Sequence, residues 1–113
     1  MRRFDEFSHN IIDSHIHVGW YDNFYFSAQE ILNIVSKLKI SKCFISSMSG
    51  WKKGTEFASN ELLNVTKSNP HIFYPLLWVN PLEEYVYEIT AKLAKKTFHG
   101  LKIHPNADGY HAS

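Results

Sequence analysis

The chain has 113 residues, of which 44% are hydrophobic and 15% aromatic, which is enough for one domain with a modest core and argues against disorder. Its net charge of +1, with acidic and basic residues mixed, excludes the strong basic footprint of a nucleic-acid or anionic-membrane binder. Cys43 is the only cysteine, and no stretch approaches the roughly 20 apolar residues of a membrane span or the apolar run of a signal peptide. We therefore expect a soluble, cytoplasmic protein that binds neither nucleic acid nor membranes.

The first predicted element is the strand "IIDSHIHV", residues 11–18. Side chains alternate along a strand, so Asp13, His15 and His17 are expected on one face and the mostly aliphatic residues on the other. A half-solvated strand usually carries Lys, Glu or Thr on its wet face. Imidazoles two residues apart can reach one ion, at about 2.0 to 2.1 Å from each nitrogen for zinc. A shared metal ion would explain the pattern, the alternative is a pair of ordinary polar histidines, and the rest of the sequence has to decide between them.

Helices and strands are expected to alternate after this strand. Residues 19–26, "GWYDNFYF", read as an aromatic loop. Ser27 followed by Glu30 forms a capping-box pattern that predicts the start of a helix. Residues 42–48, "KCFISSM", have the β-branched and aromatic content of a strand. The apolar residues at helical spacing behind the capping box are Ile31, Val35 and Leu38.

The second half of the chain continues the alternation. A helix is expected within residues 55–68, with Thr55 or Ser59 as its cap, and it should end before Pro70. The remaining predicted elements are a nearly continuous apolar strand at 72–79, a helix at 81–96 and a strand at 98–105. The order β-α-β-α-β-α-β has crossovers long enough for a parallel sheet.

Ionisable residues recur near the carboxyl end of the last strand. Lys102 and His104 alternate with Leu101 and Ile103, so an amine and an imidazole should share a face. Sites in parallel α/β sheets and barrels gather at the carboxyl ends of the strands. We therefore expect Lys102 and His104 to face the same region as His15 and His17.

The segment "IIDSHIHVG" resembles the Asp-X-His-X-His signature that opens the amidohydrolase superfamily of metal-dependent (β/α)8 barrels. With "WVNP" and "GLKIHP" it is most similar to the amidohydrolase-2 branch, over residues 11 to 106. The resemblance implies a divalent metal ion, usually Zn²⁺, held partly by His15 and His17. It also implies a small-molecule substrate and hydrolysis of C–N or C–O bonds.

The same resemblance implies ligands that this sequence does not contain. Members of the superfamily complete the site with histidines from the fifth and sixth strands and an aspartate from the eighth. A (β/α)8 TIM barrel takes about 250 residues, so residues 1–113 are expected to form one partial domain, its N-terminal half, with four parallel strands alternating with helices. We expect the chain to be a fragment or, if it is stable alone, a homo-oligomer, because its first and fourth strands would be unpaired edges.

The roles of several residues stay open at this point. His104 is the best local candidate for a third ligand or, alternatively, lines the pocket and contacts substrate. Lys102 is either a carboxylated lysine, as in two-metal branches, or a plain cation that attracts a carboxylate substrate. Asp13 is expected to support the ligands through a hydrogen bond. The aromatic loop either walls a cyclic substrate or packs onto neighbouring loops. The histidines without a pattern, expected at the surface, are His9, His71, His99 and His111.

Three further functions compete with the hydrolase. One is a metal-dependent non-oxidative decarboxylase of the same branch. Another is a TatD-like metal-dependent deoxyribonuclease, which opens with a similar His-X-His but is disfavoured by the absence of a basic patch. The last is a non-catalytic half-barrel that serves only as an assembly module.

Overall fold

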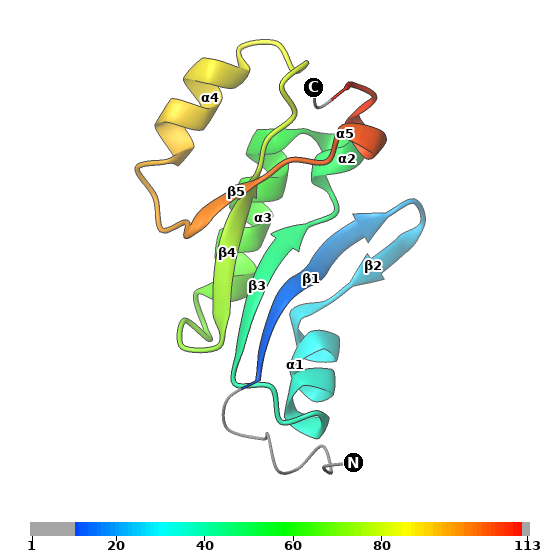
Figure 1. Cartoon of the computed structure of the whole chain (residues 1–113), viewed down its shortest axis with the longest axis vertical. Helices are drawn as coiled ribbons and strands as arrows, with labels where there is room; N and C mark the ends of the chain where they lie inside the picture. Colours follow the sequence, from blue (N-terminus) through cyan, green and yellow to red (C-terminus); the bar gives the residue numbers. More distant parts are fainter. Residues whose placement is uncertain (1–10, 112–113) are drawn as a thin grey trace.

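The computed structural model describes residues 11–111 and contains a five-stranded sheet with helices between most of the strands (Figure 1). The strand order is β2-β1-β3-β4-β5, with β1, β3, β4 and β5 parallel and β2 antiparallel to β1. In chain order the elements are β1 (Ile12–Tyr21), β2 (Phe24–Phe26), α1 (Ala28–Lys37), β3 (Lys42–Ser47), α2 (Gly50–Lys53), α3 (Thr55–Thr66), β4 (Phe73–Trp78), α4 (Val86–Leu93), β5 (Gly100–Lys102) and α5 (Pro105–Asp108). The expected α/β class with parallel strands is therefore confirmed.

The predicted capping box is present at the start of α1. Ser27 Oγ accepts the backbone N–H of Glu30 at 3.2 Å, and a Glu30 carboxylate oxygen accepts the backbone N–H of Ser27 at 2.8 Å. These bonds satisfy two amides in a turn where helices leave their N–H groups unpaired. Ile31 and Val35, one turn apart, bury the inner face of this helix.

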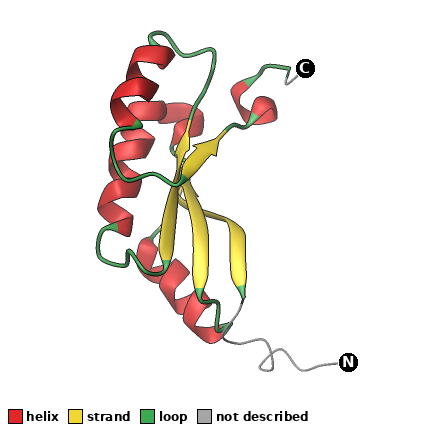
Figure 2. Cartoon of the chain, turned by 60° about the vertical axis from the view of Figure 1, so that its left-hand side comes forward, coloured by secondary structure: helices red, strands yellow, loops and turns green. Residues whose placement is uncertain are grey.

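The core lies between the sheet and its helices. α1 and α3 lie on the same side of the sheet, and α5 lies on the other side (Figure 2). β3 contributes Cys43 and Ile45 to this core, and neither has exposed surface. The buried residues of this cluster are Val18, Ile31, Val35, Cys43, Ile45, Leu62 and Phe73. Among the residues that the structure describes, no long helix crosses the opposite face of the sheet.

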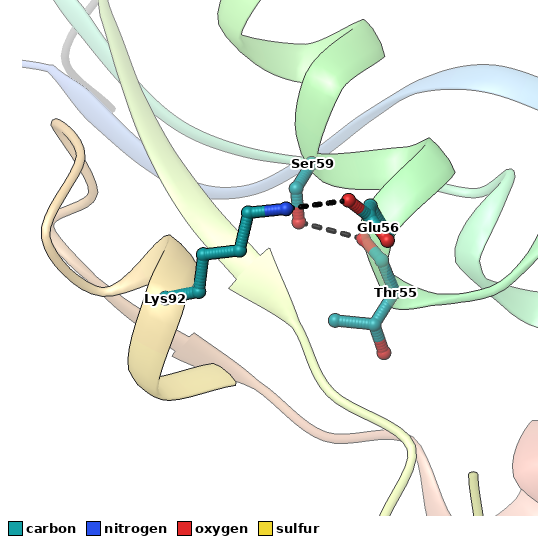
Figure 3. Close-up of polar contacts among 4 residues, drawn as sticks. All are labelled: Thr55, Glu56, Ser59 and Lys92. Atoms are coloured by element: carbon teal, nitrogen blue, oxygen red, sulfur yellow. Dashed lines mark hydrogen bonds and ion pairs between the residues drawn. The ribbon is translucent and has the colours of Figure 1, made fainter. Parts of the chain in front are cut away.

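Figure 3 shows one contact between α3 and α4 and one within α3. Lys92 of α4 pairs with Glu56 of α3 at 3.0 Å, and Ser59 Oγ donates to the backbone oxygen of Thr55 at 2.7 Å. The predicted capping of this helix by Thr55 or Ser59 is wrong. Its N-cap is Gly54, and Thr55 instead donates its N–H and hydroxyl to Glu83, so a distant carboxylate caps the helix.

The aromatic segment predicted as a loop is a β-hairpin. β1 continues to Tyr21, Asp22 adopts a left-handed conformation with φ 50°, and β2 then pairs back against the end of β1. β2 pairs with residues 19–21 at the carboxyl end of β1, so the expectation that the first strand is an unpaired edge is wrong for these residues. The edge strands of the sheet are β2 and β5.

Three smaller differences concern the helices. α2 and α5 are helices of four residues each that the sequence analysis does not predict, and α4 begins at Val86, five residues later than predicted. Among residues 11–111, no helix combines the length and the apolar character needed to cross a membrane.

A β-bulge in β1 changes which residues share a face. Asp13 pairs with Cys43, whereas His17 pairs with Ser46, and the register shifts between Asp13 and Ile16. Cys43 and Ser46 are three positions apart on β3, so their side chains point to opposite faces of the sheet. Their partners Asp13 and His17 therefore also belong to opposite faces. The expectation that Asp13 shares a face with both histidines is therefore wrong, because the bulge inserts one residue between them.

Candidate metal centre

The imidazole rings of His15 and His17 converge near the carboxyl end of β1. Their Nε2 atoms are 2.9 Å apart, and their ring centroids are 4.7 Å apart with the ring planes perpendicular. His15 is exposed and His17 is half-buried. The structure therefore brings the two nitrogens together that the His-X-His spacing predicts, on the face of the sheet away from α1 and α3.

His17 is held by the neighbouring strand. Its Nδ1 lies 2.9 Å from Ser46 Oγ, and Ser46 is 3% exposed. When Nδ1 carries the proton and donates it to Ser46, Nε2 keeps a lone pair, as metal binding requires. Ser46 is a site residue that the sequence analysis missed, because its contact with His17 depends on the register between β1 and β3.

The surroundings of His17 favour its neutral form. The pKa of His17 is lowered to about 4, mainly by burial and in addition by the charges of His15, Lys102 and His104. A hydrogen bond at Ser46 acts in the opposite direction. A neutral imidazole is the form that binds metal ions, so His17 does not have to lose a proton near neutral pH.

Asp13 supports His15 through the backbone. Asp13 Oδ1 accepts the backbone N–H of His15 at 2.9 Å, across the bulge. This bond stabilises the local geometry that places His15 opposite His17. Asp13 thus makes a supporting hydrogen bond, although to the main chain of a histidine and not to its ring.

Lys102 shares the face of the sheet that carries His17. Ser46 is paired with His17, and Trp78 is paired with Lys102, in a register that places all four residues on the same face. The charge of Lys102 is among the influences that lower the pKa of His17. The predicted convergence of Lys102 on the histidine pair is therefore consistent with the strand register.

His104 follows β5 and takes part in the local structure of α5. Its Nδ1 accepts the backbone N–H of Ala107 at 3.2 Å, which makes His104 the N-cap of this short helix. Its ring stacks on Trp78, with centroids 5.5 Å apart and planes 17° apart. The charge of His104 also acts on His17.

A carboxylate supports the site from the helix side of the sheet. Glu61 Oε1 of α3 accepts hydrogen bonds from Ser47 Oγ at 2.6 Å and Ser49 Oγ at 2.8 Å, and Ser49 Oγ accepts the backbone N–H of Trp20. Gly19 leaves room for this network, since a Cβ there would lie 2.4 Å from Glu61 Oε1. Glu61 therefore ties the carboxyl ends of β1 and β3 together, directly beyond His17 and Ser46.

The histidine pair fits a metal ion as part of a ligand set. Two nitrogens at about 2.0 to 2.1 Å from a tetrahedral zinc are about 3.3 Å apart, close to the 2.9 Å between the Nε2 atoms here. These two atoms form a hydrogen bond, so a metal ion bound by both would replace the proton that one ring donates to the other. Among residues 11–111, no group of three His, Cys, Asp or Glu side chains is arranged to hold a metal ion. Searches of protein-family models, curated proteins and solved structures found no match to this chain. The geometry therefore offers two nitrogen atoms at a separation that suits a metal ion.

The other predicted residues lie apart from the pair. His71, His99 and His111 are exposed, as expected, and His9 lies outside the described residues. Of the aromatic residues expected to wall a substrate, only Tyr21 borders the cavity beside His104. Phe24 is 68% exposed in the hairpin.

Proposed function

We propose that this chain carries part of the active site of a metal-dependent hydrolase that acts on C–N or C–O bonds. The observation that carries the proposal is the convergence of His15 Nε2 and His17 Nε2, 2.9 Å apart, near the carboxyl end of a parallel strand. In this proposal the sheet is the N-terminal half of a (β/α)8 barrel. Its face without α1 and α3 is then the barrel interior, where such sites are located.

The chain's own residues have separate tasks in this proposal. His15 and His17 would hold a divalent ion, with Zn²⁺ as the first candidate. Ser46 fixes the ring of His17, and Lys102 offers positive charge on the same face of the sheet. A bound zinc ion lowers the pKa of its water toward about 7 and polarises a substrate carbonyl, which is the chemistry that hydrolysis of an amide, ester or lactone needs.

A decarboxylase is the second candidate, and Lys102 favours it. A lysine on the face of the metal pair can attract the carboxylate that such a substrate must carry. In that reaction the metal orients the acid, and no water is added. Product analysis distinguishes the two functions, because only the decarboxylase releases carbon dioxide.

Zinc binding to the whole chain tests the proposal. Isothermal titration of the chain, after dialysis against a chelator, is expected to show zinc binding that weakens by at least about tenfold in His15→Ala and in His17→Ala. His71→Ala is the matched control, since it removes an exposed imidazole elsewhere. Equal zinc affinity in all four proteins would show that the pair does not bind the metal.

A further inference from the structure

The hydrogen bond between His104 and α5 fixes where the proton of the neutral ring is located. A backbone amide can only donate, so Nδ1 of His104, which accepts the N–H of Ala107 at 3.2 Å, must carry a lone pair. A neutral imidazole has one N–H group, and here that group must be Nε2–H. A nitrogen that bears a proton has no lone pair for a metal ion.

The orientation of this ring is fixed by packing. Trp78, which is 1% exposed, stacks on His104, and Trp78 Nε1 donates to Asp108 Oδ2 at 3.1 Å. Turning the ring over would break the bond to Ala107. The Nε2–H group is therefore held in one place before any ligand binds, as an efficient binding site requires.

His104 borders a cavity with a flat aromatic wall. The cavity has a volume of about 300 Å³ and is lined by Tyr21, Met48, Trp51, His104, Asn106 and Ala107. Tyr21 and Trp51 stack with ring centroids 5.4 Å apart and planes 26° apart. A cavity lined by aromatic side chains and by a histidine suits a planar ring that carries an oxygen acceptor.

We propose that His104 donates a hydrogen bond from Nε2 to an oxygen of a planar cyclic substrate in this cavity and does not ligate the metal. The bond would polarise a carbonyl oxygen or hold a carboxylate oxygen of the substrate. As a contribution to catalysis, this inference rests on the proposed function. The proton position and the occupation of the cavity do not depend on it.

Long-range ¹H–¹⁵N NMR of the whole chain measures which imidazole nitrogen of His104 carries the proton and which histidines respond to zinc. At pH 8, with His104→Gln used for assignment, His104 is expected to show the Nε2–H tautomer. Zinc should shift the nitrogen resonances of His15 and His17 and leave those of His104 in place. A His104 ring with its proton on Nδ1, or a zinc-induced shift equal to that of the pair, would overturn the inference.

Benzamide is the ligand probe, because it is planar, carries a carbonyl oxygen and is neutral, so attraction to Lys102 does not confound its binding. It is expected to shift His104 Nε2 and to bind about tenfold more weakly to His104→Gln, whose zinc affinity stays within about twofold of the wild type. His71→Gln should bind benzamide as the wild type does. No binding at millimolar benzamide, or binding that leaves the His104 resonances unchanged, would refute the cavity assignment.

The two proposals fail separately. If the wild-type chain binds no zinc, the proposed metal-dependent function fails, while the tautomer and benzamide measurements still decide the role of His104. If zinc binds to His15 and His17 and also shifts His104 equally, the function stands and the inference fails.

Discussion

At the scale of single residues, the main chain at the carboxyl end of β1 packs closely against the carboxylate of Glu61. Gly19 has φ +92° and lies against Ser47, Ser49 and Glu61, so any Cβ would be strained and would collide with the network. The network connects Trp20 of β1 to α3 and so fixes the strand end that carries the histidine pair.

Gly19→Ala is expected to lower the free energy of unfolding by about 2 kcal/mol or more, since it combines left-handed strain with loss of the Glu61 hydrogen bonds. Urea denaturation measures the change. Gly109→Ala is the matched control, because Gly109 also has positive φ but its Cβ would meet nothing within 4 Å. Equal losses in the two variants would show that crowding at Gly19 is unimportant.

Protonation of His17 should make stability depend on pH. Its pKa is about 4 in the folded chain, against about 6.5 for a free imidazole, so between these values the unfolded chain takes up a proton that the folded chain does not. The contribution of His17 to the free energy of unfolding is therefore expected to fall as pH drops from 6.5 to 4. Urea denaturation of the wild type and of His17→Gln, with a chelator present, isolates the contribution of His17 as a function of pH. If the free energies of unfolding of the two proteins change with pH in parallel, the lowered pKa of His17 is contradicted.

Individual residues of the site differ in how far sequence reveals them. The convergence of His15 and His17 follows from strand geometry alone, because residues two apart share a face. Ser46 and Glu61 were missed, since their contacts with the site depend on strand register and on how α3 packs against the sheet. Asp13 was assigned to the wrong face of the sheet because simple alternation assumes a regular strand, whereas β1 contains a bulge next to Asp13. The hydrogen bond from the His15 amide to Asp13 lies at this bulge.

At the scale of the elements, local signals were the most informative. The capping box at Ser27 and Glu30 marks the start of α1, because both of its bonds lie within four residues. The hairpin of β1 and β2 was missed because its two-residue turn, Asp22 and Asn23, lacks the glycine that marks the common hairpin turns. Glu83 caps α3 from a loop that is 28 residues away in the sequence, so a local sequence pattern cannot predict this contact.

Ser27→Ala is expected to destabilise the chain by about 1 kcal/mol, because the loss of Ser27 Oγ leaves the amide of Glu30 without its acceptor. Thermal or urea unfolding provides the measurement. Ser36→Ala, at an exposed position in the same helix, changes the same atoms without a cap and should have little effect. If the two variants are equally stable, the cap contributes nothing.

At the scale of the whole molecule, one side of the sheet lacks the cover that α1 and α3 give to the other side (Figure 2). β5 is an edge strand, and Leu101 within it and Ile103 directly after it are 61% and 52% exposed. Exposed apolar side chains at a free sheet edge promote association.

We therefore expect the chain to self-associate at micromolar concentrations, as measured by sedimentation velocity. Replacing Leu101 and Ile103 with lysine should shift the distribution toward monomer, because charge at an edge opposes pairing. Ile34→Lys, at an exposed position on α1, is the control and should leave association unchanged. A wild-type chain that stays a monodisperse monomer would contradict this expectation.

X-ray absorption at the zinc edge of the zinc-loaded chain tests the central claim, that His15 and His17 hold one metal ion, most directly. The account predicts nitrogen or oxygen neighbours at about 2.0 Å, with the outer-shell scattering of imidazole rings, and loss of that imidazole signal when both histidines are replaced by alanine. A zinc spectrum without imidazole scattering, or one that the double replacement leaves unchanged, would contradict it.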